Sequence, residues 1–97
     1  MAFTTRTATI NTAALATQTL PEEAVQVLAI VGLAGGATAI AATTYTVQST
    51  APASATEVEF TGSANAPSET LTFDAALTAN GVLFVTYVPV GAVPASL

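Results

Sequence analysis

The sequence predicts a mainly β protein, a small antiparallel β-sandwich or barrel-like domain, from three observations. Residues 71–90 form two apolar runs around Asn80-Gly81, the pair that most strongly favours a two-residue hairpin turn. Residues 57–61 alternate polar and apolar side chains, as a half-buried strand does. The chain is also rich in β-branched threonine and valine, which favour strands over helices.

Residues 1–12 are predicted to form an extended N-terminal arm. Its threonines, Thr5, Thr7 and Thr9 among them, give strong β propensity but little difference between the two faces. A strand that is polar on both faces is typical of an arm or edge strand that pairs with something else. The segment has no basic region followed by an apolar run, so it does not read as a secretory signal.

Residues 19–48 form an apolar central segment with two interpretations. Thr19 and Glu22 fit the start of a helix, as N-cap and capping-box residues, which would give one short helix near 20–33. The valines and isoleucine of 24–33 instead favour a strand, followed by a Gly35-Gly36 hairpin turn. The strand interpretation is preferred.

Residues 24–42 carry no charge and are long enough to cross a bilayer as a helix. Against a membrane helix, the segment is rich in Ala, Gly and Thr and has no Lys or Arg on either flank. A buried segment of a soluble fold is preferred.

Residues 56–90 are predicted to hold the sheet core, with Val58 and Phe60 inward and residues 91–97 as an extended tail. A two-residue loop at Asn80-Gly81 sets the hairpin register and places one apolar face on the core. That face comprises Leu71, Phe73, Ala75, Leu77 and Ala79 opposite Val90, Val88, Thr86, Phe84 and Val82. The other face carries Leu83, Val85 and Tyr87, which are either covered within the fold or form a subunit interface. All of 1–97 is predicted to be one structural domain.

The balance of charge limits the partners of this chain. Of its 97 residues 52% are hydrophobic and only 7% are charged, with one Lys or Arg and a net charge of −5. An ordinary soluble domain has about 25% charged residues, so we expect partners to cover a large part of the surface. We expect no direct binding of nucleic acid, because that binding needs Lys and Arg to neutralise phosphates.

The chain offers little catalytic chemistry. It has no Cys and no His, and its single basic residue is Arg6, which removes disulfides, thiolate metal sites and the commonest catalytic bases and nucleophiles. Glu57 and Glu59 are interpreted as the solvated face of a strand rather than as a carboxylate pair, and Glu22-Glu23 lacks a calcium loop. We therefore expect no enzyme, no cofactor, no metal and no small-molecule substrate.

In its size and its Ala/Thr/Val-rich β composition the chain resembles the small virion proteins of tailed bacteriophages, particularly capsid decoration or cement proteins. The resemblance implies a small β-rich homo-oligomer, often a trimer, that binds a major capsid protein on the outer surface of an icosahedral shell. It also implies assembly in the host cytoplasm. The candidate interface residues are Phe3, Thr5, Arg6, Thr7, Thr9, Leu83, Val85, Tyr87, Val93 and Leu97.

Two other functions remain open. One is a self-assembling filament or a tail-tube or pilus-like subunit, in which the N-terminal arm completes a neighbour's sheet by strand addition. The other is a small membrane-embedded oligomer built on residues 24–42.

Overall fold

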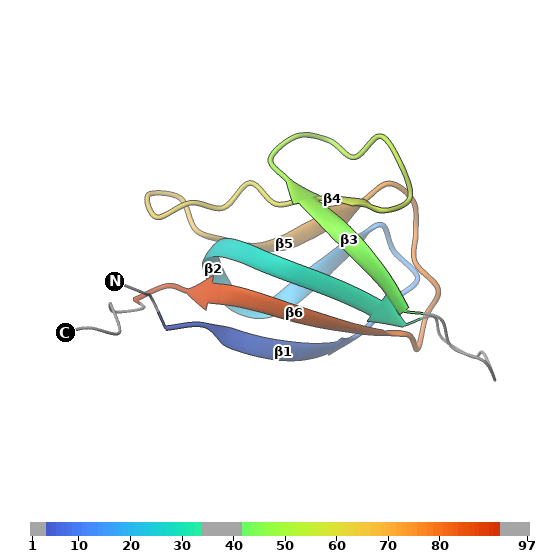
Figure 1. The fold of residues 1–97 in the computed structure, drawn as a ribbon, viewed down its shortest axis with the longest axis horizontal. Coiled ribbons are helices and arrows are strands. Elements are labelled where there is room, and N and C mark those ends of the chain that lie inside the picture. Colours follow the sequence, from blue (N-terminus) through green and yellow to red (C-terminus); the bar gives the residue numbers. More distant parts are fainter. Residues whose placement is uncertain (1–3, 34–41, 92–97) are drawn as a thin grey trace.

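The computed structural model describes residues 4–33 and 42–91, in which all regular structure is β-strand (Figure 1). In chain order the strands are β1 Arg6–Asn11, β2 Thr17–Leu33, β3 Ala42–Gln48, β4 Glu57–Glu59, β5 Ser68–Phe73 and β6 Val82–Pro89. The predicted mainly β, barrel-like fold class is confirmed: the strands form a small closed barrel with two further strands attached.

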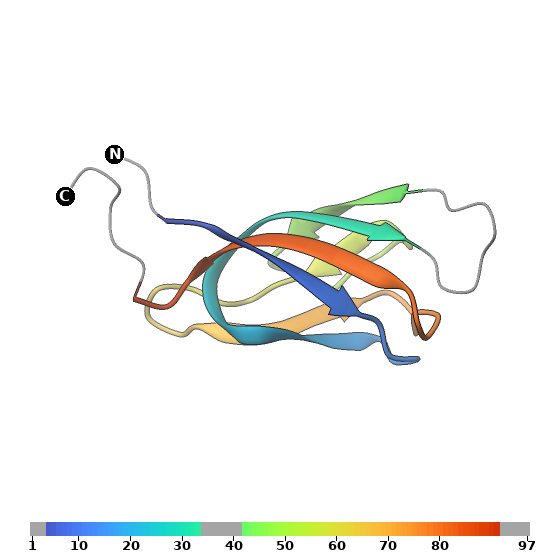
Figure 2. The same ribbon diagram turned by 90° about the horizontal axis from the view of Figure 1, so that it is seen from below.

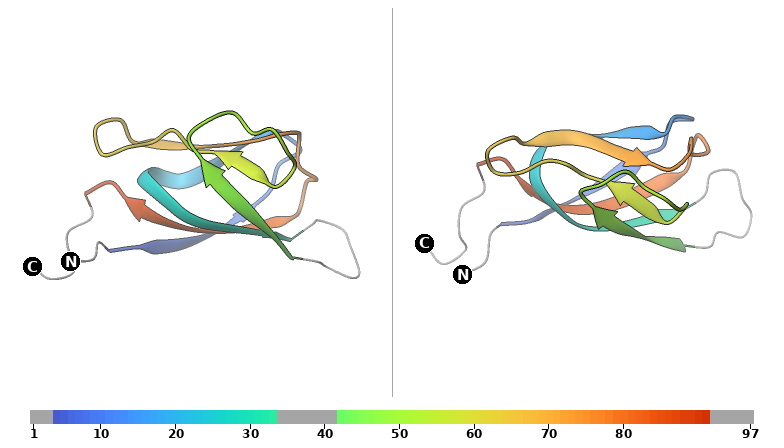
Figure 3. Two further views of the ribbon diagram at one scale, coloured as in Figure 1. Left: turned by 45° about the horizontal axis from the view of Figure 1, so that its top comes forward. Right: turned by 90° about the horizontal axis from the view of Figure 1, so that it is seen from above.

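The barrel closes on β2, the longest strand. Residues 17–24 of β2 pair with β5, while its C-terminal half pairs with β3 on one edge and β6 on the other. β3 pairs with β4 in parallel and β4 pairs with β5, which completes the ring β2–β3–β4–β5 (Figure 3). β6 and then β1 extend the sheet from the other edge of β2. Figure 2 shows β2 bending from one layer of the barrel to the other.

Irregularities in pairing accompany the bend of β2. Its register shifts between Thr19 and Ala24 against β5, and twice more between Ala24 and Ala29 against β6. Such bulges increase local bending and twist. Pro21 falls in the first shift, where the ladder is interrupted and its missing N–H is tolerated.

The strand interpretation of 24–33 is confirmed, and the short helix near 20–33 is wrong. Val25, Val27, Ile30 and Val31 prefer an extended backbone, and pairing with two neighbouring strands outweighs the helix-start signal at Thr19. Leu33 pairs with Ala42, so β2 and β3 are antiparallel as expected; the predicted Gly35-Gly36 turn lies outside the described residues.

The core lies inside the barrel and receives side chains from every strand. Ile30, Val58, Leu71 and Val85 are fully buried. Val58 and Phe60 point inward as predicted. The Tyr45 ring meets the Phe73 ring edge-on, with centroids 5.1 Å apart. Other core residues are Leu20, Ala24, Val27, Phe73, Leu83 and Tyr87, against which Ala8, Ile10, Val47 and Leu77 pack.

The predicted 71–90 hairpin is wrong. β5 and β6 do not pair with each other: β5 lies beside β2 and β4, and β6 lies between β1 and β2. In the predicted hairpin register, Leu71 and Phe73 of β5 would share a face with Val88 and Val90. The apolar side chains of Leu83, Val85 and Tyr87 would then lie on the other face of the hairpin. Placing β5 and β6 in opposite walls of the barrel lets both apolar sets point into one core.

The change of partner strands reverses the two faces of β6 over Leu83–Tyr87, whereas Val88 is buried as predicted. Leu83, Val85 and Tyr87 are 1%, 0% and 2% exposed, so the first of their two predicted alternatives, cover within the fold, is correct. Phe84, assigned to the core by the sequence, is 39% exposed, and Val90 is 51% exposed.

The predicted two-residue turn at Asn80-Gly81 is also wrong: of these two residues only Asn80 has a positive φ, and Thr12, just after β1, holds the segment. Asn80 adopts the left-handed region with φ 67°, which asparagine tolerates. The Gly81 N–H donates to Thr12 Oγ1 (2.8 Å), and this hydroxyl donates to the Thr78 carbonyl (2.6 Å). The Thr12 N–H and carbonyl bond to the Gly81 carbonyl (2.9 Å) and the Asn80 N–H (3.1 Å).

The prediction of an extended arm over 1–12 is also wrong for its second half. Residues 6–11 form β1, which pairs with β6 along its whole length. Its side chains do differ between faces, since Ala8 and Ile10 pack on the core while Thr7 and Thr9 are exposed. The alternation of small apolar residues and threonines was sufficient to make it an edge strand of its own sheet.

Candidate functional site

The outer surface of the sheet β1–β6–β2–β3 is uncharged. Side chains that are paired in register across the four strands share this surface, because the alternate residues of each strand point into the core. We call it the uncharged face. It comprises Thr7, Thr9 and Asn11 of β1, Val82, Phe84 and Thr86 of β6, Ala29, Val31 and Leu33 of β2, and Ala42, Thr44 and Thr46 of β3.

Phe84 occupies the middle of the uncharged face. It is paired with Thr9 of β1 on one side and with Val31 of β2 on the other. Two residues along each strand, the Thr7 and Thr86 hydroxyls lie 3.3 Å apart, which confirms that β1 and β6 present these side chains to the same side. An aromatic residue that is 39% exposed within a surface free of charge is typical of a contact surface.

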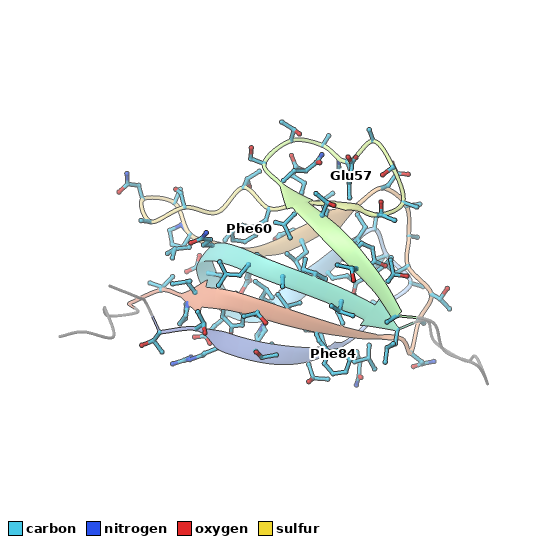
Figure 4. All side chains as sticks on the ribbon, viewed as in Figure 1. Glu57, Phe60 and Phe84 are labelled. Atoms are coloured by element: carbon cyan, nitrogen blue, oxygen red, sulfur yellow. The ribbon has the colours of Figure 1, made fainter. Side chains whose placement is uncertain are left out.

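The acidic side chains gather elsewhere. Glu57 and Glu59 belong to β4, Glu69 belongs to β5, and Asp74 follows β5 directly. Figure 4 places Phe84 beside β1 and β6, and Glu57 on the far side of the molecule near β4. The described part of the protein is therefore asymmetric, with an uncharged face on one wall and most of its carboxylates on the other.

One edge of the same sheet is open. Among the described residues, β1 pairs only with β6, so its other edge offers backbone N–H and C=O groups with no strand beside them. Natural edge strands are commonly protected by charged side chains, especially lysine, by proline or by a bulge. The one charged residue of β1 is Arg6, at its first position, where it pairs with Glu22. β1 contains no lysine or proline, and its register against β6 is continuous from Arg6 to Asn11, without a bulge. We call this the open edge.

The single basic residue is engaged at one end of β1. Arg6 Nη1 lies 2.5 Å from Glu22 Oε2, and the Tyr87 hydroxyl donates to the same oxygen (2.6 Å). The Tyr87 hydrogen bond, followed by that from Arg6, lowers the pKa of Glu22 below its ordinary value. Burial, with the Glu22 hydrogen bond second, raises the pKa of Tyr87. The cluster joins β1, β2 and β6.

This cluster should contribute to acid sensitivity. Because the pKa of Glu22 is lowered by folding, its contribution to stability is complete above the pKa of an unfolded glutamate, about 4.3, and is lost as pH falls through the lowered value. We expect Glu22→Gln to flatten the fall in unfolding free energy in this acid range, as measured by urea denaturation. Tyr87→Phe removes the hydrogen bond that is the larger cause of the lowered Glu22 pKa. It should therefore also flatten the fall in unfolding free energy over the same pH range. An equally steep fall of unfolding free energy with pH in wild type and both variants would contradict the role given to Glu22.

The acidic side chains of the described residues do not gather into a metal-binding group. Glu57 Oε1 accepts the backbone N–H groups of Ala53 (2.7 Å) and Ser54 (3.1 Å), so it organises the turn before β4. No group of three acidic side chains within residues 4–33 and 42–91 is placed to hold a metal ion. A cavity of about 390 Å³ lies beside the segment after β5, and Asp74 and Tyr45 are the ionisable side chains that line it.

The structure distributes the predicted interface residues into three groups. Thr5, Arg6, Thr7 and Thr9 are exposed, and Thr7 and Thr9 belong to the uncharged face. Leu83, Val85 and Tyr87 are buried in the core. Phe3, Val93 and Leu97 lie outside the described residues.

Sequence reasoning missed Phe84, Val31 and their neighbours on β2 and β6 as surface residues. Both β2 and β6 are apolar on both faces, so the sequence does not indicate which face is outside.

Comparison with protein-family models, curated proteins and solved structures finds no match for this chain. In the described residues no helix is long and apolar enough to span a membrane. The described part of 24–42, the segment considered for a membrane helix, belongs to β2 and the first residue of β3.

Proposed function

We propose that this chain is a non-enzymatic virion structural protein, a capsid decoration protein that binds the outside of an icosahedral shell and stabilises it. The observation that carries the proposal is the uncharged face, a broad sheet surface with exposed Phe84 near its middle. A contact surface without charge loses no ion hydration when a partner covers it.

The distribution of charge supports an outward orientation. With the uncharged face against a shell, Glu57, Glu59, Glu69 and Asp74 would face solvent. A net charge of −5 would be repelled by packaged nucleic acid, which favours the outer rather than the inner side of a shell. The barrel presents this face on hydrogen-bonded strands rather than on loops, so little order has to be gained on binding.

The alternative is a filament or tube subunit that grows by strand addition. The open edge of β1 favours this alternative, since it offers unpaired backbone groups to another strand. The two functions differ in the surface that they require: a decoration protein needs the uncharged face, and a filament formed by strand addition needs the open edge.

The proposal is tested on intact virus particles isolated by density gradient from the source of the sequence. We expect to find the protein in the gradient band that contains the capsids. A mild chaotrope should release it from the particles while the shell remains intact around the genome. Added back, wild-type protein should rebind, and Phe84→Lys should bind at least about tenfold more weakly, because a charge would be buried without a partner.

Thr70→Lys is the matched control. It adds the same charge at an exposed position of β5, away from the uncharged face. We expect it to bind like wild type. Absence of the protein from the particles, or equal binding by the two lysine variants, would contradict the proposed function.

A further inference from the structure

We infer that the open edge of β1 binds β1 of a second copy of this chain, antiparallel, about a two-fold axis that lies between the two copies of Thr9. This inference deepens the proposed function, because it names a second copy of the chain as one partner of the subunit. The biological purpose of the contact rests on the proposed function. Its own basis is the hydrogen bonding, side-chain order and charge of β1.

The backbone groups that face the open edge can be identified. The N–H and carbonyl of Thr12 point toward the β6 side, where they bond to Gly81 and Asn80. Because successive residues of a strand point their backbone groups to opposite edges, Thr7, Thr9 and Asn11 point theirs to the open edge. The close approach of the Thr7 and Thr86 hydroxyls, 3.3 Å, agrees, since side chains come closest at pairs that do not bond to each other.

A two-fold axis perpendicular to the sheet restricts the register. Paired residues must lie on the same face, so the axis lies midway between two copies of the same residue, and edge-facing backbone groups must meet each other. Centred on Thr9, the pairing joins Thr9 to Thr9, and Thr7 to Asn11, on the uncharged face. On the core side it joins Ala8 to Ile10. Every cross-strand pair is therefore either polar with polar or apolar with apolar, as stable sheets require.

Centred on Ala8, the pairing would place Arg6 opposite Ile10, and centred on Ile10 it would place Ala8 opposite Thr12, so both registers set a polar side chain against an apolar one. Charge separates the remaining registers. Centred on Thr9, Arg6 lies opposite Thr12 of the second copy, and the two Arg6 residues are about 20 Å apart along the strands at ~3.4 Å per residue. Centred on Thr7, they would be only about 7 Å apart and would repel each other. Centred on Asn11, most of β1 would have no partner strand.

The two-fold contact between β1 strands forms a closed dimer and places the uncharged faces of both copies side by side. A two-fold pairing uses the open edge of both copies, so it ends growth instead of propagating a filament. The axis keeps the same side of both sheets up, so the two uncharged faces join into one continuous surface. Strand pairing thereby removes the edge that would otherwise favour aggregation.

The test uses the full chain and its lack of cysteine. In Thr9→Cys the two sulfurs would sit on residues paired across the axis, with Cα atoms about 5.5 Å apart, which fits a disulfide. In the control Thr7→Cys, on the same strand and face, the two positions would be about 14 Å apart and cannot bridge. Both variants are oxidised mildly, checked by circular dichroism, and separated on non-reducing gels.

We expect most Thr9→Cys protein to form a covalent dimer, at least about tenfold faster than Thr7→Cys. A mixture of Thr7→Cys and Asn11→Cys should form the mixed dimer at a rate close to that of Thr9→Cys. Equal rates for the two single variants, or no dimer from either, would overturn the inference. Binding to particles, which depends on Phe84, is measured separately, so failure of this contact and failure of the proposed function are distinguishable.

Discussion

Leu83→Ala is expected to lower the free energy of unfolding by about 2–5 kcal/mol, the usual cost of truncating a leucine in a packed core. Leu83 is 1% exposed on β6, the strand that lies between β1 and β2, and its side chain also approaches Gly32. Removing it leaves a cavity that surrounding strands, held by their ladders, can fill only in part.

Phe84→Ala is the matched control, because Phe84 is the next residue on the same strand and points to the uncharged face. Although phenylalanine is the larger side chain, its truncation should cost only about 1 kcal/mol, since 39% of it is already in water. Urea denaturation of the two variants measures both values. The hairpin register predicted from the sequence gives the opposite order, so a larger loss in Phe84→Ala would contradict the orientation of β6.

Gln18→Leu is expected to destabilise the protein by about 3 kcal/mol, because it leaves backbone polar groups without their partner. Gln18 is 3% exposed in β2. Its Oε1 accepts the Ala13 N–H (3.0 Å), and its Nε2 donates to the carbonyls of Ala13 (2.9 Å) and Leu15 (2.8 Å). One amide thereby organises the connection from β1 to β2.

Gln26→Leu provides the comparison for this effect. Gln26 lies on the same strand but is exposed, and its replacement should change the free energy of unfolding by less than about 0.5 kcal/mol. Chemical denaturation of both variants, with circular dichroism as the signal, checks the difference. Similar stabilities would mean that the Gln18 amide does not hold the connection.

The local strand signals of this sequence were predictable, but the partners of the strands were not. Alternation in Glu57–Glu59, with Val58 buried, and the β-branched run of β2 each indicated a strand from short-range information. Pairing β6 with β1, some 75 residues away, required knowledge of which apolar sets share a core. The Asn80-Gly81 pair suggested a local hairpin turn, whereas hydrogen bonds with Thr12 join this segment to the end of β1.

The candidate site was predictable only on β1. Thr7 and Thr9 stand out because a strand with exposed threonines and few charges is typical of an edge. Phe84 was assigned to the wrong face, since β6 is apolar on both faces and only the tertiary fold distinguishes them. The Arg6–Glu22–Tyr87 cluster was missed because Glu22 reads locally as a helix-start residue and Tyr87 lies 65 residues further along.

The most direct test of the central claim, that this chain is an assembly subunit, is the mass of the purified protein in detergent-free buffer. Light scattering after size exclusion is combined with circular dichroism on the same peak. We predict a β-rich spectrum and a mass that is an even multiple of 9.6 kDa, beginning with the dimer. A β-rich species that remains at 9.6 kDa as its concentration is raised would contradict the claim.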